Sequence, residues 1–115
     1  MITMKPILEP DVVALLNAGR FEGELEGYVM TDGGNYLGYC LYRVAQGVTT
    51  VLDVSAPDHM TTDGLVRAAV AKGENGGAKA FALNRENKAL SDWAQAFVPH
   101  ETEPVPTEKI FGHCS

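Results

Sequence analysis

Cysteine and long apolar runs are what this 115-residue chain most clearly lacks. Its two cysteines, Cys40 and Cys114, do not form a disulfide framework, and free thiols are typical of a reducing compartment. No segment approaches the roughly 20 apolar residues that a membrane-spanning helix needs, and the first ten residues lack the charged start and apolar stretch of a signal peptide. We therefore expect a cytoplasmic protein without a membrane partner.

Clustered positive charge is also missing. The chain has 9 Lys and Arg against 15 Asp and Glu, a formal net charge of -6, and its basic residues are scattered. Nucleic acids are bound through clustered Lys and Arg, so no nucleic-acid partner is expected. His59, His100 and His113 show no H-x-x-x-H spacing, and the cysteines show no C-x-x-C spacing, so no metal is expected. The negative charge favours a small molecule that carries an amine.

Hydrophobic residues are plentiful enough for one core. They make up 45% of the chain and charged residues 21%, a composition that suits a single domain over residues 1–115. The segment KPILEP (5–10) is short and flanked by prolines, which predicts an edge strand. Pro10 suits the first position of a helix and Gly19 suits its end. The predicted apolar face of this helix consists of Val12, Val13, Leu15 and Leu16.

An antiparallel meander is predicted from about Leu25 to Ser55. The sequence Asp-Gly-Gly-Asn at 32–35 favours a hairpin because glycine and asparagine tolerate positive φ, and Gln46-Gly47 marks a second turn. Tyrosines and leucines between these turns have high strand propensity. The meander therefore supplies three strands.

A strand–helix–strand unit follows the meander. Apolar residues recur at helical spacing between Thr61 and Gly76-Gly77, so Thr61 or Thr62 is expected to cap the helix and the glycines to end it. Strands at 51–54 and 80–83 flank this helix closely enough to lie parallel in one sheet. A last helix carries Trp93 on its apolar face, residues 100–109 are proline-rich and extended, and KIFGHCS (109–115) is expected to add a final strand.

This order of elements resembles the GCN5-related N-acetyltransferase (GNAT) fold in a shortened form. The resemblance runs from about Ile7 to Val98, and "Ser55-Ala56-Pro57-Asp58" partly matches the V-x-P-[DE] pattern that ends the fourth strand of that family. It implies an α/β (α+β) domain with a mixed, mostly antiparallel sheet and one parallel βαβ unit. It also implies that acetyl-CoA binds where the two parallel strands separate.

The resemblance implies a particular set of cofactor contacts. The backbone of Ser55 and Ala56 would contact acetyl-CoA, and its phosphates would lie against Thr61, Thr62 and Gly64 at the helix N-terminus, where N–H groups and the helix dipole favour anions. The loop departs from the family pattern R/Q-x-x-G-x-G/A, because it reads PDHMTTDG. It has no arginine and lacks the paired glycines, and two aspartates bring negative charge to the phosphate position.

The catalytic residues of the family also have only partial counterparts in this sequence. Acyl transfer to an amine needs a base, and Asp53 on the fourth strand is the candidate. Trp93 stands where the family has a tyrosine acid, and an indole has no proton to give in that role. Two functions follow: an acetyl-CoA-dependent N-acetyltransferase with a degenerate phosphate loop and an unidentified amine acceptor, or a non-catalytic domain that binds another small ligand or a protein, including a second copy of itself.

Overall fold

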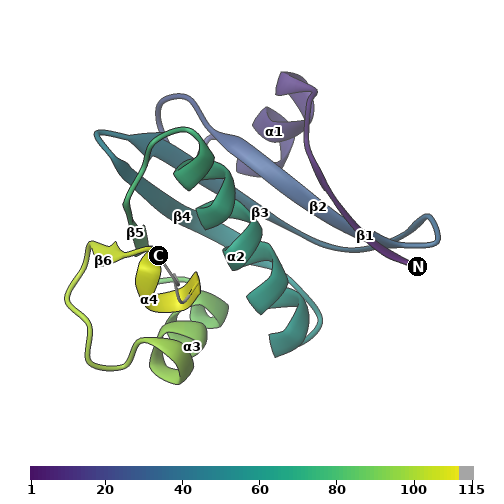
Figure 1. The fold of residues 1–115 in the computed structure, drawn as a ribbon. Coiled ribbons are helices and arrows are strands. Elements are labelled where there is room, and N and C mark those ends of the chain that lie inside the picture. Colours follow the sequence, from purple (N-terminus) through teal and green to yellow (C-terminus); the bar gives the residue numbers. More distant parts are fainter. Residues whose placement is uncertain (112–115) are drawn as a thin grey trace.

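The protein is described here by a computed structural model that covers residues 1–111. Within these residues the chain forms one sheet flanked by helices (Figure 1). In chain order the elements are β1 (Ile2–Pro6), α1 (Pro10–Asn17), β2 (Glu26–Asp32), β3 (Asn35–Ala45), β4 (Val48–Ser55), α2 (His59–Asn75), β5 (Ala80–Leu83), α3 (Lys88–Phe97), β6 (Val105–Pro106) and α4 (Glu108–Phe111).

The sheet has the mixed topology that the sequence predicts. The strands of the described chain follow the order β1-β2-β3-β4-β5-β6, and neighbouring strands are antiparallel except β4 and β5. These two are parallel, with Val48 opposite Ala80 and Val51 opposite Leu83. A crossover through α2 joins them. The predicted fold class, a mostly antiparallel sheet with one parallel βαβ unit, is confirmed.

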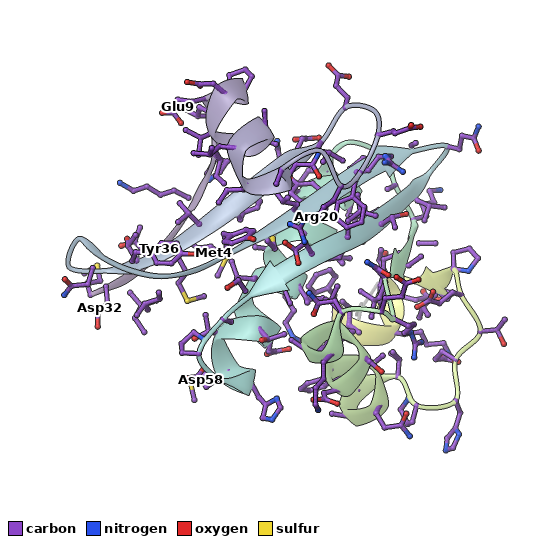
Figure 2. All side chains as sticks on the ribbon, turned by 180° about the vertical axis from the view of Figure 1, so that it is seen from behind. Met4, Glu9, Arg20, Asp32, Tyr36 and Asp58 are labelled. Carbon is purple, nitrogen blue, oxygen red and sulfur yellow. The ribbon has the colours of Figure 1, made fainter. Side chains whose placement is uncertain are left out.

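Helix α2 covers one face of the sheet and α1 lies on the other (Figures 1 and 2). The main core lies under α2, where Leu65, Val66, Ala69 and Val70 have no exposed surface, as their helical spacing predicts. Trp93 of α3 belongs to the same core and is 3% exposed, which confirms its predicted packing role. Beneath α1 a smaller apolar layer contains Val13, Leu41 and Leu52.

The first helix buries less than its sequence suggests. Val13 is 8% exposed but Leu15 is 79% exposed, so the predicted apolar face is only partly correct. Two residues along a helix correspond to a rotation of about 200°, which places Leu15 almost opposite Val13. Strand β1 also begins earlier than predicted, at Ile2, and ends at Pro6. It is an edge strand, paired only with β2 within the described residues.

The C-terminal strand prediction is wrong for the residues that can be checked. Lys109 to Phe111 lie in the helical turn α4, and residues 112–115, which include Cys114, lie outside the described part. The last strand is instead Val105–Pro106, inside the segment predicted to be extended, and it pairs antiparallel with β5. Among residues 1–111 no helix is both long and apolar enough to cross a membrane.

Candidate functional site

Strand β4 extends beyond the end of β5. Their pairing stops at Val51 and Leu83, where β5 ends, whereas β4 continues to Ser55. Two asparagine side chains lie against the unpaired end of β4. Asn84 Nδ2 donates to the Leu52 carbonyl at 3.0 Å, and Asn87 Nδ2 donates to the Val54 carbonyl at 3.1 Å. Side-chain amides therefore satisfy β4 carbonyl groups that a longer β5 would otherwise bond.

Asn87 also starts α3. Its Oδ1 accepts the Leu90 N–H at 3.1 Å, which is the usual bond of an asparagine N-cap. The sequence carries a signal for this arrangement, because two asparagines three residues apart directly follow a buried strand. The sequence alone did not assign the two asparagines a role.

Asp53 lies on the α1 face of β4, beyond the end of the pairing with β5, and the residue is 7% exposed. Its Oδ2 pairs with Arg20 Nη2 at 2.7 Å and accepts the Tyr39 hydroxyl at 2.9 Å. Its Oδ1 accepts from Asn87 Nδ2 at 3.0 Å. Figure 2, drawn from the α1 side, shows Arg20 over the middle of the sheet. The candidate base is thus a buried carboxylate held by three donors that sequence reasoning did not select.

This cluster shifts the titration of its members. The hydrogen bond to Asp53 raises the pKa of Arg20, a shift that partial burial opposes. Burial raises the pKa of Tyr39, and its hydrogen bond to the Asp53 carboxylate raises it further. Both groups therefore keep their protons at neutral pH. Arg20 also donates to the Leu16 and Asn17 carbonyls at 3.1 and 3.0 Å, so it connects the end of α1 to β4.

The first turn of α2 is capped by its own acid. The N-cap is Asp58 rather than Thr61 or Thr62, and its Oδ1 accepts the Thr61 N–H at 2.8 Å. This bond lowers the pKa of Asp58. The Asp58 carbonyl accepts both the N–H of Thr62, at 3.2 Å, and its hydroxyl, at 3.1 Å. The capping prediction was wrong because the helix begins at His59, and its N-cap lies at least three residues earlier than expected.

The residues proposed to contact the cofactor do not all face one space. Ser55 is exposed at the end of β4, and Ala56 lines a hollow beside the first turn of α2. Thr62 lines the same hollow, although the residue is 3% exposed, and Thr61 is 7% exposed. Gly64 faces the sheet instead, because a Cβ added there would meet the methyl groups of Met30 and Met4.

The hollow is part of a groove between α2 and α3. One section has a volume of about 340 Å³ and lies beside Pro57, Lys88 and Ala89. A second section of about 430 Å³ lies beside Trp93 and Phe97. Both sections are lined by His59, Thr62 and Asp92, which makes them continuous. Asp58 lies at the start of α2 near this groove (Figure 2).

Asp63 is not directed at the phosphate position that the sequence suggested. Its Oδ1 pairs with Arg67 Nε at 2.7 Å and accepts the Trp93 indole N–H at 2.8 Å. Arg67 in turn donates to the Ile110 carbonyl at 2.7 Å and lies over the Phe97 ring. Asp63 therefore ties α2 to α3, and the carboxylates that line the groove are those of Asp58 and Asp92. Across residues 1–111 no group of three or more His, Cys, Asp or Glu could hold a metal ion.

The architecture around this groove is a GNAT-like acyltransferase fold, as three solved structures show. The aminoglycoside acetyltransferase AAC(6')-Iy, solved with the bisubstrate analog CoA-S-monomethyl-acetylneamine, aligns over 91% of this chain and 95% of its own, with a TM-score of 0.65 and 16% identity. An IAA acetyltransferase from Bacillus cereus ATCC 14579 aligns over 84% of this chain and 75% of its own, with a TM-score of 0.58 and 15% identity.

A third likeness is to an aminoglycoside acetyltransferase from an uncultured soil metagenomic sample, solved with sisomicin. It covers 90% of this chain and 91% of its own, with a TM-score of 0.53 and 10% identity. No protein-family model matches the sequence, and a search of curated proteins found no match. At these identities the likeness establishes the fold, and function has to be argued from the site.

Proposed function

We propose that the protein is an acyl-CoA-dependent N-acyltransferase, with acetyl-CoA as its donor. The position of the groove carries this proposal, because the N-terminal turns of α2 and α3 line it together just after the carboxyl end of β4. The acetyltransferase activity of the three structural neighbours supports it. So does the CoA analog in one of their structures.

The groove offers a phosphate group several donors. The N–H groups of His59 and Met60 begin α2 and have no hydrogen-bond partner in the described chain. Lys88 extends from the start of α3, is 88% exposed, and pairs with Asp92 at 2.9 Å. Helix N-termini and a nearby ammonium both attract anions. These groups fit a phosphate, and Lys88 takes the place of the arginine that the loop lacks.

The Asp58 carboxylate opposes phosphate binding in this groove. Its carboxylate occupies one N–H of the turn and places a negative charge beside the groove. A phosphate bound nearby is repelled by that charge, so the affinity is lower than that of a glycine-lined loop.

Among the residues assigned to the cofactor from the sequence, Ala56 and Thr62 line the groove. Ser55 supplies backbone at its edge, and Thr61 and Gly64 support the turn from its buried side.

An acyl-CoA supplies an acyl group activated as a thioester. The chain has to bind the acceptor amine and remove its proton, and Asp53 is the carboxylate that we assign to this step. Arg20 and Tyr39 fill both acceptor positions of Asp53 Oδ2. Within residues 1–111, Asp53 Oδ1 accepts only from Asn87, so one of its lone pairs is left to take a proton.

The bonding of Asp53 also favours a second function, a non-catalytic domain of the same fold that binds another small ligand or a protein. All three hydrogen bonds to this carboxylate come from side chains of the protein itself, which suits a structural role. In that case the Asp53 cluster holds α1, β3, β4 and α3 together and performs no chemistry.

Isothermal titration with acetyl-CoA and with CoA separates the two functions. We expect a dissociation constant below about 1 mM for the acyltransferase, and no heat at that concentration for the alternative. Lys88→Ala should weaken binding roughly fivefold by removing a charge from the groove. Lys79→Ala is the matched control, because Lys79 is an exposed lysine beyond the other end of α2. Equal effects of the two substitutions would place the cofactor elsewhere.

A further inference from the structure

Helix α1 carries an apolar strip that the rest of the chain leaves largely uncovered. Val13 is the buried residue of this helix. At about 100° per residue, Leu16, Val12 and Leu15 lie roughly 60°, 100° and 160° away from it, all in the same rotational sense. Exposure increases in that order: Leu16 is partly buried, Val12 is 38% exposed and Leu15 is 79% exposed. The strip therefore leads from the sheet to the outer side of the helix.

The inner part of the strip forms one wall of a hollow of about 380 Å³. Val12 and Leu16 line this hollow from α1, and its other walls come from β1 and from the β2–β3 hairpin, which supplies Tyr36. Figure 2, drawn from the α1 side, shows Tyr36 near the hairpin turn. Leu15 does not line the hollow but projects beside it from the outer side of α1. One face of the protein thus combines an apolar projection with an apolar hollow.

We propose that this face binds a second copy of the same chain about a two-fold axis, with Leu15 of each copy in the hollow of the other. A two-fold contact uses the same patch on both copies, so the patch has to complement itself. A projection beside a hollow of the same apolar character meets that requirement. A small ligand would fill the hollow and leave Leu15 in water. The contact is independent of the proposed acyl-CoA groove, which lies on the α2 side of the sheet.

The exposed apolar area suits a weak dimer. Tyr36 is 60% exposed at the edge of the hollow. The exposed parts of Val12, Leu15 and Tyr36 together amount to roughly 350 Å², a patch size that often marks a contact site on a monomer. Two copies contribute about 700 Å² of this surface, and the charged rim adds to it, which places the contact at the small end of specific interfaces. We therefore expect a dissociation constant on the order of 10 μM.

Charges around the hollow also complement each other. Lys5 lies at its rim, and Asp11 lies one turn before Leu15 on the outer side of α1. Both are exposed, and neither forms an ion pair within residues 1–111. The rim also carries Glu9, so Asp11 of the second copy has to approach from the Lys5 side. The axis forms this Lys5–Asp11 contact twice, which offsets part of the repulsion between two chains of net charge -6.

Analytical ultracentrifugation over a range of protein concentrations tests the dimer. Leu15→Lys should weaken association at least about tenfold, because it would place a charge in the apolar hollow. Met60→Lys is the matched control and should have no effect, because Met60 is 82% exposed on α2, which covers the other face of the sheet. Both positions are exposed enough to accept lysine, and circular dichroism checks the fold. A wild-type chain that stays monomeric would leave the hollow to a small ligand and overturn the proposal, as would equal effects of the two substitutions.

A charge exchange tests the two-fold arrangement itself. Lys5→Glu and Asp11→Lys each bring like charges together at both contacts, so each variant alone should associate about fivefold more weakly than the wild type. In an equal mixture of the two variants, a Lys5→Glu chain facing an Asp11→Lys chain has opposite charges at both contacts. The mixture should therefore regain the association of the wild type. A mixture that associates no better than either variant alone would contradict the proposed contact.

Discussion

At the scale of single residues, Asp53 shows how a buried charge is held. Its residue is 7% exposed, and removing a carboxylate from water costs several kcal/mol unless donors replace the lost hydration. Three side chains supply those donors: Arg20 just after α1, Tyr39 on β3 and Asn87 at the start of α3. Position 53 therefore connects three separate parts of the chain, whether or not it takes part in catalysis.

Removing Arg20 should destabilise the protein more than removing a comparable surface arginine. In Arg20→Ala the Asp53 carboxylate remains buried without its cation, and we expect a loss of about 1 to 3 kcal/mol in the free energy of unfolding. Arg85 is the control, because it is 43% exposed, close to the 46% of Arg20, and pairs with Glu103 at 3.2 Å. The side chain of Glu103 is 26% exposed, against 10% for the side chain of Asp53. Because water reaches Glu103 more easily, Arg85→Ala should cost less than about 1 kcal/mol.

Urea denaturation measures both variants. Equal losses for Arg20→Ala and Arg85→Ala would mean that Asp53 does not depend on its cation.

The Asp58 carboxylate stabilises the start of α2, but it also repels a phosphate bound in the groove. The Thr61 N–H lowers the pKa of this carboxylate in the folded state, so its charged form stabilises the helix start. That contribution is present above the ordinary value of 3.8 and is lost as the pH falls through the lower folded-state pKa. Asparagine also caps helices well, but it carries no charge.

Asp58→Asn should therefore change binding and leave stability at pH 7 nearly unchanged. We expect acetyl-CoA to bind roughly tenfold more tightly, because the repulsion of its phosphates is removed. Thermal melts of the variant should vary less with pH below about 4 than those of the wild type. Asp63→Asn is the control for binding, since Asp63 is engaged by Arg67 and Trp93. If both variants tighten acetyl-CoA binding equally, the charge of Asp58 repels the phosphates no more strongly than the charge of Asp63.

At the scale of elements, the contact between α2 and β4 depends on a glycine. A Cβ added at Gly73 would collide with the Thr49 side chain, whose buried hydroxyl has no hydrogen-bond partner within residues 1–111. At Gly64, on the same helix, an added Cβ would meet only the flexible ends of Met30 and Met4. The two glycines therefore differ in how tightly the sheet packs against them.

Gly73→Ala should cost about 1 to 3 kcal/mol through overpacking. Gly64→Ala should be close to neutral, because the methionine ends can move and alanine gains about 1 kcal/mol of helix propensity. Thr49→Ala made in the Gly73→Ala background should restore part of the loss by removing the colliding atoms. Denaturant unfolding of these three variants checks this. No restoration would show that the strain lies in the helix backbone instead.

Elements with local signals were predictable from the sequence. The Asp-Gly-Gly-Asn turn defines the β2–β3 hairpin, where Gly33 and Gly34 have φ values of 58° and 92°, and the apolar period of α2 agrees with its buried residues. The start of α2 was misplaced because Asp58 and Thr61 are both acceptable caps. The strand expected over residues 109–115 is absent from residues 109–111, and Val105–Pro106 occupies the edge of β5 instead.

At the scale of the whole molecule, the site was less predictable than the fold. The hydrogen-bond partners of Asp53 lie 14, 33 and 34 residues away in sequence, so no local pattern connects them. The sequence showed that the usual phosphate loop is absent. It did not show that Lys88 enters the groove from α3, or that Asp63 turns toward Trp93. These placements follow from how α3 packs against α2, which only the folded chain determines.

The central claim is that the groove formed by α2 and α3, beyond the carboxyl end of β4, binds an acyl-CoA. Isothermal titration of acetyl-CoA into the wild-type chain tests it most directly, with Asp58→Asn measured alongside. The account predicts a dissociation constant below about 1 mM for the wild type and a roughly tenfold lower value for the variant. Absence of binding by both proteins at millimolar acetyl-CoA would contradict it.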